Sequence, residues 1–291
     1  MKKSTLIISM ILAIFFSACG GGSGSGDKIV NYDSENDERV DYDDENSKKI
    51  LLVKSTTFDK DSEKEIMGQT YQYDSNHNRI GYTHISPESN VTCNFIYDNQ
   101  YRPKNIKCNY VTTNRRYEVE TKNYFNDDKW TRKERYEDGE LVSSEKALSW
   151  DDDGNPTKTE WKIFNSNIEL TTTANYVKDN IIHVETISKS DENIISEIID
   201  NKYDNKNAPC MANGNKKTPC IVSDGNNNII KTTTTITTTT NNFVINSKRI
   251  TENRITFNED DFPSRIDTTI IDYINGAEEH KSSYYTIYEY Q

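Results

Sequence analysis

The sequence predicts an all-β fold of about sixteen strands in up-and-down antiparallel order, forming a sheet that curls into a barrel or half-barrel. Two observations support this fold class. From residue 49 to residue 291, short runs of Ile, Val, Thr, Tyr and Phe alternate with clusters of Asn, Asp, Gly and Ser, and no long segment has a helical period. In addition, an aromatic residue followed by a polar turn recurs at a nearly constant interval.

The repeating unit is predicted to be a β-hairpin. Its clearest copy is Trp150–Asn155, where an aromatic residue is followed by three Asp, Gly and Asn. Successive aromatic positions lie 24 to 28 residues apart, and the last interval of 54 residues spans two units. A unit of that length holds two strands and two turns. The aromatic positions are Tyr73, Tyr97, Phe125, Trp150, Tyr176, Tyr203 and Phe257, and the turns at the other end are expected at residues 86–89, 113–115, 137–140, 165–167, 190–193 and 275–277.

Apolar and polar residues alternate within the predicted strands, so one face of the sheet is apolar. Three cross-strand pairs are expected on this face: Tyr71 with Tyr82, Tyr73 with Ile80, and Ile255 with Ile266. Because no helix is predicted that could cover the apolar face, the sheet is expected to close on itself. A membrane-spanning barrel is the alternative, but the mean hydropathy of −0.88 and the Thr-rich strand Thr232–Thr240 favour a barrel in water.

The first residues have the pattern of an export signal. Lys2 and Lys3 precede an apolar stretch from Leu6 to Phe16, which is too short to span a bilayer as a permanent helix, and small residues follow up to Cys19. This pattern resembles the lipobox of bacterial lipoproteins. The resemblance implies a signal peptide over residues 1–18 and a diacylated Cys19 that attaches the protein to the outer membrane. An ordinary signal peptide followed by a chance cysteine is the alternative.

Residues 19–48 are predicted to form a flexible, acidic tether between the lipidated cysteine and the β domain at residues 49–291. The tether begins with a Gly/Ser stretch at residues 20–26, and an acidic run follows at residues 32–46. Acidic residues behind a lipidated cysteine also resemble a surface-export signal of some Gram-negative lineages. The formal net charge of −12, without a basic stripe, argues against nucleic-acid binding and against electrostatic adhesion to anionic lipid. Membrane attachment would therefore depend on the acyl chains.

Four cysteines follow Cys19, an even number in an oxidising compartment. Cys93 and Cys108 flank a turn at residues 98–103, and pairing Tyr97 with Lys104 places the two cysteines opposite each other on one face. We expect a cross-strand disulfide there. Cys210 and Cys220 enclose a loop with Pro and Gly and are expected to form the second bridge. A zinc site is the rival interpretation, but no CxxC pair and no His at ligand spacing supports it.

The aromatic-Asp-x-x-Gly-Asn pattern at Trp150–Asn155 resembles the YD repeats of RHS-type proteins. The arrangement as a whole is similar to a family of Bacteroidota envelope lipoproteins of unknown function with a porin-like β fold. The lipobox, the segment Tyr203–Pro209, and the ending formed by Phe257–Pro263 and Tyr288–Tyr290 carry this resemblance, which covers residues 50 to 291. It implies no catalytic residues.

Few residues indicate chemistry. Asp151, Asp152 and Asp153 look like half of a calcium loop, but the chain returns to a strand at once, and a tight turn needs the same residue types. The histidines have no partners at a fixed spacing, and no nucleophile, zinc-protease or phosphate-binding motif is present; they lie at His77, His84, His183 and His280. We therefore expect no enzyme activity, no cofactor and no bound metal.

The 18 Tyr, 3 Trp and 9 Phe are typical of both sheet cores and binding surfaces, and most occupy repeat positions. Residues 204–226 interrupt the repeat and form a candidate binding loop with Asp204, Cys210, Met211, Asn213 and Cys220, or a decoration without function. The sequence thus predicts a lipid-anchored envelope protein that acts as a non-enzymatic binding or interaction module. The alternative is a carrier or chaperone that holds a lipophilic or glycan ligand inside the curled sheet; the ligand would be a glycan, peptide or lipid.

Overall fold

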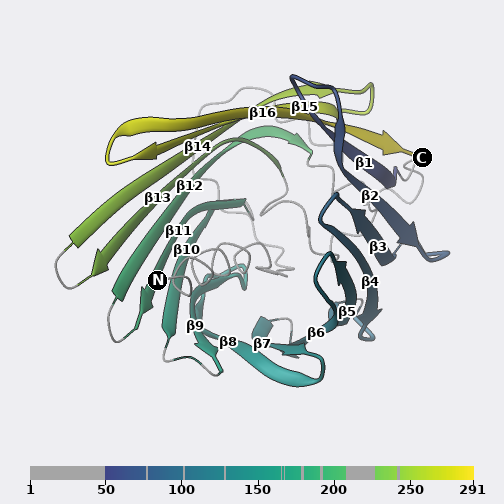
Figure 1. Ribbon diagram of the computed structural model, residues 1–291. Helices are drawn as coiled ribbons and strands as arrows, with labels where there is room; N and C mark the ends of the chain where they lie inside the picture. Colours follow the sequence, from purple (N-terminus) through teal and green to yellow (C-terminus); the bar gives the residue numbers. More distant parts are fainter. Residues whose placement is uncertain are drawn as a thin grey trace.

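The computed structural model describes residues 50–207 and 227–291, apart from positions 77, 101, 128, 165, 167, 178, 179, 191, 192, 241 and 242. The described residues form one closed barrel of sixteen antiparallel strands, in which every strand pairs with its neighbours in the chain and β1 pairs with β16 (Figure 1). This confirms the predicted all-β fold and shows that the sheet closes completely. The predicted signal peptide, the tether and Cys19 lie outside the described residues.

The strands are β1 (Leu52–Asp59), β2 (Glu65–Tyr73), β3 (Arg79–Ile85), β4 (Ser89–Tyr97), β5 (Pro103–Thr112), β6 (Arg116–Asn126), β7 (Lys129–Glu137), β8 (Glu140–Trp150), β9 (Pro156–Ile163), β10 (Glu169–Val177), β11 (Asn180–Lys189), β12 (Asn193–Asn207), β13 (Asn227–Thr240), β14 (Phe243–Phe257), β15 (Pro263–Ile274) and β16 (Ala277–Tyr290). The long strands β12 to β16 stand together on one side of the ring, and the shorter strands complete it (Figure 1).

Most strands alternate between buried and exposed residues, although β14 and β16 contain no buried residue. In β4, Val91, Cys93 and Phe95 are buried, whereas the alternate residues are exposed. The barrel wall is a single layer of strands, so only its inner face is shielded by the opposite wall. The buried face is therefore the inner face. Because directly paired residues of neighbouring strands lie on the same face, the cross-strand pairs identify the inward-facing residues of every strand in the ring.

The predicted aromatic positions lie at or next to the ends of the even-numbered strands, apart from Tyr203, which lies four residues before the end of β12; they mark one rim of the barrel, which we call the aromatic rim. Where these residues carry a hydroxyl or an indole N–H, this group donates a hydrogen bond to a backbone carbonyl near the start of the preceding odd-numbered strand. The donor–acceptor pairs are Tyr73–Leu52, Tyr97–Arg79, Trp150–Trp130, Tyr176–Pro156, Tyr203–Ile181 and, at the end of β16, Tyr290–Pro263, with distances of 2.6 to 3.1 Å.

Two rim positions are Phe, which has no donor. At these strands an Asn side chain supplies the bond: Asn123 donates to the Pro103 carbonyl at 2.9 Å, and Asn253 donates to the Ile229 carbonyl at 2.8 Å. Each even-numbered strand is therefore bonded by a side chain to its preceding odd-numbered strand. A cation lies over each Phe ring instead, Arg102 over Phe125 and Lys206 over Phe257.

β-Bulges at the aromatic rim correct two of the predicted pairs. Tyr73 pairs with Arg79 instead of Ile80, and Tyr97 pairs with Pro103 instead of Lys104, because an extra residue follows each turn on the second strand. The pairs Tyr71–Tyr82 and Ile255–Ile266, away from the rim, are confirmed. A bulge disrupts the ladder locally, and the side-chain bonds at this rim satisfy carbonyls of the residues paired there.

The turns that follow the aromatic residues are held by their first polar side chain. The Asp151 carboxylate accepts the Asn155 backbone N–H at 2.7 Å and its side-chain amide at 3.1 Å, and Gly154 adopts a φ of +87°. Asp74 binds Asn78 in the same way. Residues 151–153 are therefore a turn, as the alternation of strands favoured, and their aspartates shape the backbone.

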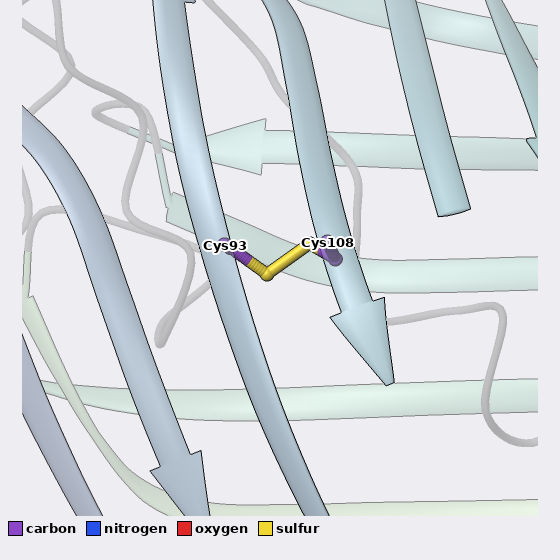
Figure 2. The surroundings of a disulfide bond; sticks show 2 residues. All are labelled: Cys93 and Cys108. Atoms are coloured by element: carbon purple, nitrogen blue, oxygen red, sulfur yellow. A yellow bond between two sulfur atoms is a disulfide. The ribbon is translucent and has the colours of Figure 1, made fainter. Parts of the chain in front are cut away.

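The disulfide between Cys93 and Cys108 is confirmed. The two residues are directly opposite each other on β4 and β5, with a Cα–Cα distance of 4.0 Å, and their bridge joins the neighbouring strands (Figure 2). Val91, Phe95, Tyr82 and other apolar side chains of the inner face pack around it. The expected bridge between Cys210 and Cys220 lies outside the described residues.

Removing this disulfide by the double substitution Cys93→Ala and Cys108→Ala should lower the free energy of unfolding. The bridge closes a loop with a sequence separation of 15, for which loss of the constraint on the unfolded chain costs about 3 kcal/mol. Urea unfolding of the oxidised proteins measures this difference. The variant Cys210→Ala and Cys220→Ala isolates the other pair, and an unchanged midpoint in the Cys93/Cys108 variant would contradict the prediction.

The rim bonds predict a second stability effect. Tyr176→Phe removes only the hydroxyl that donates to the Pro156 carbonyl, so it should cost about 1 kcal/mol of unfolding free energy. Tyr273→Phe is the matched control, because the Tyr273 hydroxyl makes no hydrogen bond to any described residue. Equal unfolding midpoints for the two variants in urea would show that the rim bond contributes nothing.

Candidate binding surface inside the barrel

Aromatic side chains line the inner face from β16 to β6, over seven consecutive strands of the sixteen-strand ring. We call this set the tyrosine belt; its members are Tyr288 on β16, Tyr71 on β2, Tyr82 on β3, Phe95 on β4, Tyr110 on β5 and Tyr117 on β6. Ring centroids lie 6.4 Å apart for Tyr71 and Tyr82, 6.3 Å for Tyr82 and Phe95, and 4.8 Å for the stacked pair Tyr110 and Tyr117. Register brings these residues together from strands that are neighbours in the ring.

The belt is only partly covered. Tyr82, Tyr110 and Tyr117 are half-buried, although they point into a closed barrel. Solvent therefore reaches the inner face at these positions. Burial raises the pKa of the Tyr82 phenol to about 12 and also raises the pKa of Tyr71 and Tyr110. These phenols stay neutral at physiological pH, so they offer apolar ring faces together with hydroxyl donors.

The opposite wall has a different chemistry. The inner faces of β12 to β15 carry hydroxyl and amide groups in hydrogen-bonded pairs: Thr232 donates to Asn201 at 2.8 Å, and Thr268 donates to Asn253 at 2.8 Å. Further along this wall Arg249 holds the Asp272 carboxylate with two nitrogens, at 2.7 and 3.1 Å. The interior thus has an aromatic side and a polar side.

A buried ion pair lies between these two sides. Lys133 on β7 and Glu145 on β8 approach to 2.7 Å, and their side chains are only 8% and 7% exposed. The Lys133 ammonium also lies 4.6 Å from the centroid of the Trp161 ring. Because each charge neutralises the other, this pair costs less than two isolated charges and leaves little net field in this part of the interior.

Glu197 on β12 is a buried carboxyl group without a charged partner among the described residues. It is 7% exposed and faces inward between Thr186 of β11 and Ile236 of β13. Burial raises its pKa above the ordinary value. Sequence reasoning did not single out this residue, since nothing in a strand rich in Ile marks one Glu as inward-facing except its alternation with Ile195 and Ile199.

The outer face is strongly charged. Ion pairs join side chains of neighbouring strands on this face, at Lys54–Glu289, Lys107–Glu120, Lys231–Glu252 and His183–Asp200. Within β7, Arg132 approaches Glu134, which also accepts hydrogen bonds from Tyr124 and Tyr136. The outer face is therefore rich in charges, whereas the inner face combines aromatic and hydroxyl-bearing side chains with the ion pairs Lys133–Glu145 and Arg249–Asp272.

The structure places only part of the sequence-predicted sites. Asp204 caps the end of β12: its carboxylate accepts the backbone N–H groups of Lys206 and Asn228 and the Asn228 side-chain amide at 3.0 to 3.2 Å. Burial raises the pKa of Asp204, and these bonds oppose the rise. The other members of the candidate loop, Cys210, Met211, Asn213 and Cys220, lie outside the described residues.

The residues that the structure describes form no metal-binding cluster. No group of three or more His, Cys, Asp and Glu side chains there could hold a metal ion. Burial lowers the pKa of His84, whose ring nitrogen lies 3.5 Å from the Gln69 amide. His183 binds Asp200 on the outer face at 2.7 Å. Residues 50–207 and 227–291 also contain no helix long and apolar enough to cross a membrane.

Comparison with known proteins gives only distant similarities. No protein-family model matches the chain, and no curated protein matches it. Among the solved structures that are similar, two are described as porin-like proteins. A porin-like protein from Bacteroides uniformis ATCC 8492 is 11% identical with a TM-score of 0.35, over 82% of this chain and 98% of that chain. A porin-like protein from Bacteroides vulgatus ATCC 8482 is 9% identical with a TM-score of 0.38, over 83% of this chain and 98% of that chain. Similarity at this distance assigns no activity.

The unpaired carboxyl of Glu197 predicts a pH-dependent stability. Because its pKa is raised above 4.5 in the folded protein, the stability that Glu197 contributes is fully present below about pH 4.5 and is lost as the pH rises through the folded pKa. Glu197→Gln should abolish this loss and make the protein more stable than wild type at neutral pH. Urea unfolding from pH 4.5 to pH 8 measures it.

The matched control for this experiment is Glu160→Gln, on the exposed face of β9. If wild type and the Glu197 variant give parallel stability curves over the whole pH range, the carboxyl is not energetically unpaired and the prediction is wrong.

Proposed function

We propose that this protein is a non-enzymatic binding protein of the cell envelope, attached to the outer membrane through a lipid on Cys19, and that its barrel holds an amphiphilic ligand against the tyrosine belt. The lipobox-like residues before Cys19 and the Gly/Ser-rich stretch after it support the anchor. The YD-like repeats agree with the envelope lipoproteins that the sequence resembles. The barrel itself supplies the argument for binding.

The observation that carries the proposal is the polarity of the wall. A barrel embedded in lipid presents an apolar band outward, and Lys or Arg at mid-membrane on that face costs about 2–4 kcal/mol. Here the outer face bears ion pairs such as Lys107–Glu120 and Lys231–Glu252, whereas the inner face bears the tyrosine belt. Such a wall suits a barrel that stands in water and offers its apolar surface to a ligand inside.

The two sides of the interior indicate the ligand class. Half-buried aromatic rings stack on acyl chains, on fused rings and on the apolar faces of sugars. The Thr and Asn side chains on β12 to β15 offer hydrogen bonds to a polar group of the same ligand. An amphiphile, such as a lipid with a polar head or a glycolipid, uses both sides. This is the carrier that the sequence left as its alternative.

A second function, recognition of another macromolecule, is favoured by a separate observation. At the rim opposite the aromatic rim, the long strands carry exposed apolar side chains, with Phe243 73% exposed, Val244 57%, Ile245 51%, Ile194 48% and Ile274 46%. Apolar clusters at a surface often mark interaction sites. This rim would serve an interaction module independently of the barrel interior.

The binding proposal is tested with the full-length protein extracted from membranes. Mass spectrometry of natively purified material should show diacylated Cys19 and a co-purified amphiphile. An unmodified N-terminus would contradict the anchor. The absence of any co-purified molecule would count against the carrier.

In a separate titration, the apolar fluorophore N-phenyl-1-naphthylamine should bind and be displaced by the extracted lipid. Tyr110→Ala, on the belt, should weaken binding of the fluorophore about 3- to 10-fold. Tyr136→Ala, on the outer face where the hydroxyl binds Glu134, should leave it unchanged. If the two variants behave alike, the fluorophore does not bind the belt and the interior is not the binding surface.

A further inference from the structure

Arg79 is the most deeply buried charged residue at the edge of the tyrosine belt. It opens β3 at the aromatic rim and is 1% exposed. Its guanidinium carbon lies 4.9 Å from the centroid of the Tyr71 ring, so the charged group points to the inner face where the belt lies. Its backbone carbonyl accepts the Tyr97 rim bond, which holds the start of the strand in place.

The charge of Arg79 is not neutralised by the described residues. The guanidinium reaches the Tyr73 hydroxyl, but Nε and Nη2 have no hydrogen-bond partner and no carboxylate of the described residues forms an ion pair with the group. Arg keeps its proton under all physiological conditions. A buried charge without a counter-charge is strongly unfavourable, and a fold that retains one commonly uses it.

Two other arginines of this protein show which group the Nε–Nη2 edge of Arg79 is suited to bind. Arg249 holds Asp272 through Nε and Nη2 at 2.7 and 3.1 Å, and Arg265 holds Asp267 through the same two atoms at 2.9 and 2.8 Å. This side of a guanidinium matches two oxygens of a planar anion. In Arg79 the same Nε–Nη2 edge is buried and has no hydrogen-bond partner among the described residues.

We propose that Arg79 is the anion-binding residue of the barrel interior, and that it holds the carboxylate or phosphate head of an amphiphile whose apolar body lies along the tyrosine belt. This inference rests on the proposed function and names the ligand class for that site: an anionic lipid rather than a neutral lipid or a glycan. The head group forms two charge-assisted hydrogen bonds with Nε and Nη2 and supplies the counter-charge that the protein lacks.

The neighbours of Arg79 are consistent with entry of such a ligand from the interior. The Arg79 guanidinium lies over the Tyr71 ring, hydrogen-bonds Tyr73 and acts electrostatically on Tyr82. Leu52 and Phe262, both fully buried, belong to the hydrophobic cluster in which these tyrosines pack. Tyr82 is half-buried, and its hydroxyl makes no hydrogen bond to a described residue. We therefore expect Tyr82 to be the side chain that rotates to admit the head group.

The test compares three probes of equal chain length, dodecanoate, dodecyl phosphate and dodecanol, by calorimetric titration of the full-length protein at neutral pH. The anionic probe that fits should bind about 10- to 100-fold more tightly than the alcohol. Arg79→Met keeps a long side chain but removes the charge. This variant should bind the anionic probe and the alcohol with about equal affinity. Arg265→Met is the matched control, because that charge lies on the outer face and is already paired with Asp267.

The unfolding midpoint without ligand supplies an independent readout. Removal of an uncompensated buried charge should leave the Arg79→Met protein at least as stable as wild type. A less stable variant that still prefers the anion would show that Arg79 is a structural residue, and this would overturn the inference.

The remaining outcomes separate the two proposals. Equal binding of acid, phosphate and alcohol, unaffected by Arg79→Met, would overturn the role of Arg79 and leave the apolar interior site intact. Failure of all three probes to bind would overturn the proposed function itself. Binding of only one anion would support the inference and identify the head group as carboxylate or phosphate.

Discussion

A side-chain hydrogen bond at the open end of each hairpin is the interaction on which the rest of the barrel depends. The strands of an odd–even pair are joined by their turn at one rim, and at the other rim a Tyr, Trp or Asn of the even strand bonds a carbonyl of the odd strand. The residue that carries this carbonyl is itself paired, next to a bulge, with the aromatic rim residue of the preceding hairpin. Arg79, for example, accepts the bond from Tyr97 and pairs with Tyr73. Each bond therefore closes the open end of its own hairpin at a residue that pairs with the neighbouring hairpin, and the series runs around the ring from Tyr73–Leu52 to Tyr290–Pro263.

Closure of the sheet, in which β1 pairs with β16, decides which of its faces is enclosed. A single-layer barrel has no helices to cover either face, so one face is enclosed and the other meets solvent. The ion pairs on the outer face and the tyrosine belt inside show which face is enclosed. Because sixteen strands make a ring too wide for side chains to fill, several belt residues remain half-exposed.

Charge inside the barrel is handled in two ways. Lys133 and Glu145 neutralise each other, as do Arg249 and Asp272. Arg79 and Glu197 have no such partner among the described residues, so the fold bears the cost of their burial. Unpaired buried charges weaken the empty protein and strengthen a complex that supplies the counter-charge.

The sequence by itself determined the features that depend on local pattern. Strand number and order, the aromatic ends of the even-numbered strands, the Asp151 turn and the Cys93–Cys108 bridge could all be predicted, since alternation and turn spacing act over a few residues. Tertiary structure decided the rest. The bulge that pairs Tyr73 with Arg79 lies where the rim bonds are made, and closure brings Leu52 to Tyr290 from the two ends of the domain. Whether Arg79 is paired or unpaired depends on side chains contributed by several strands, which no local pattern in the sequence records.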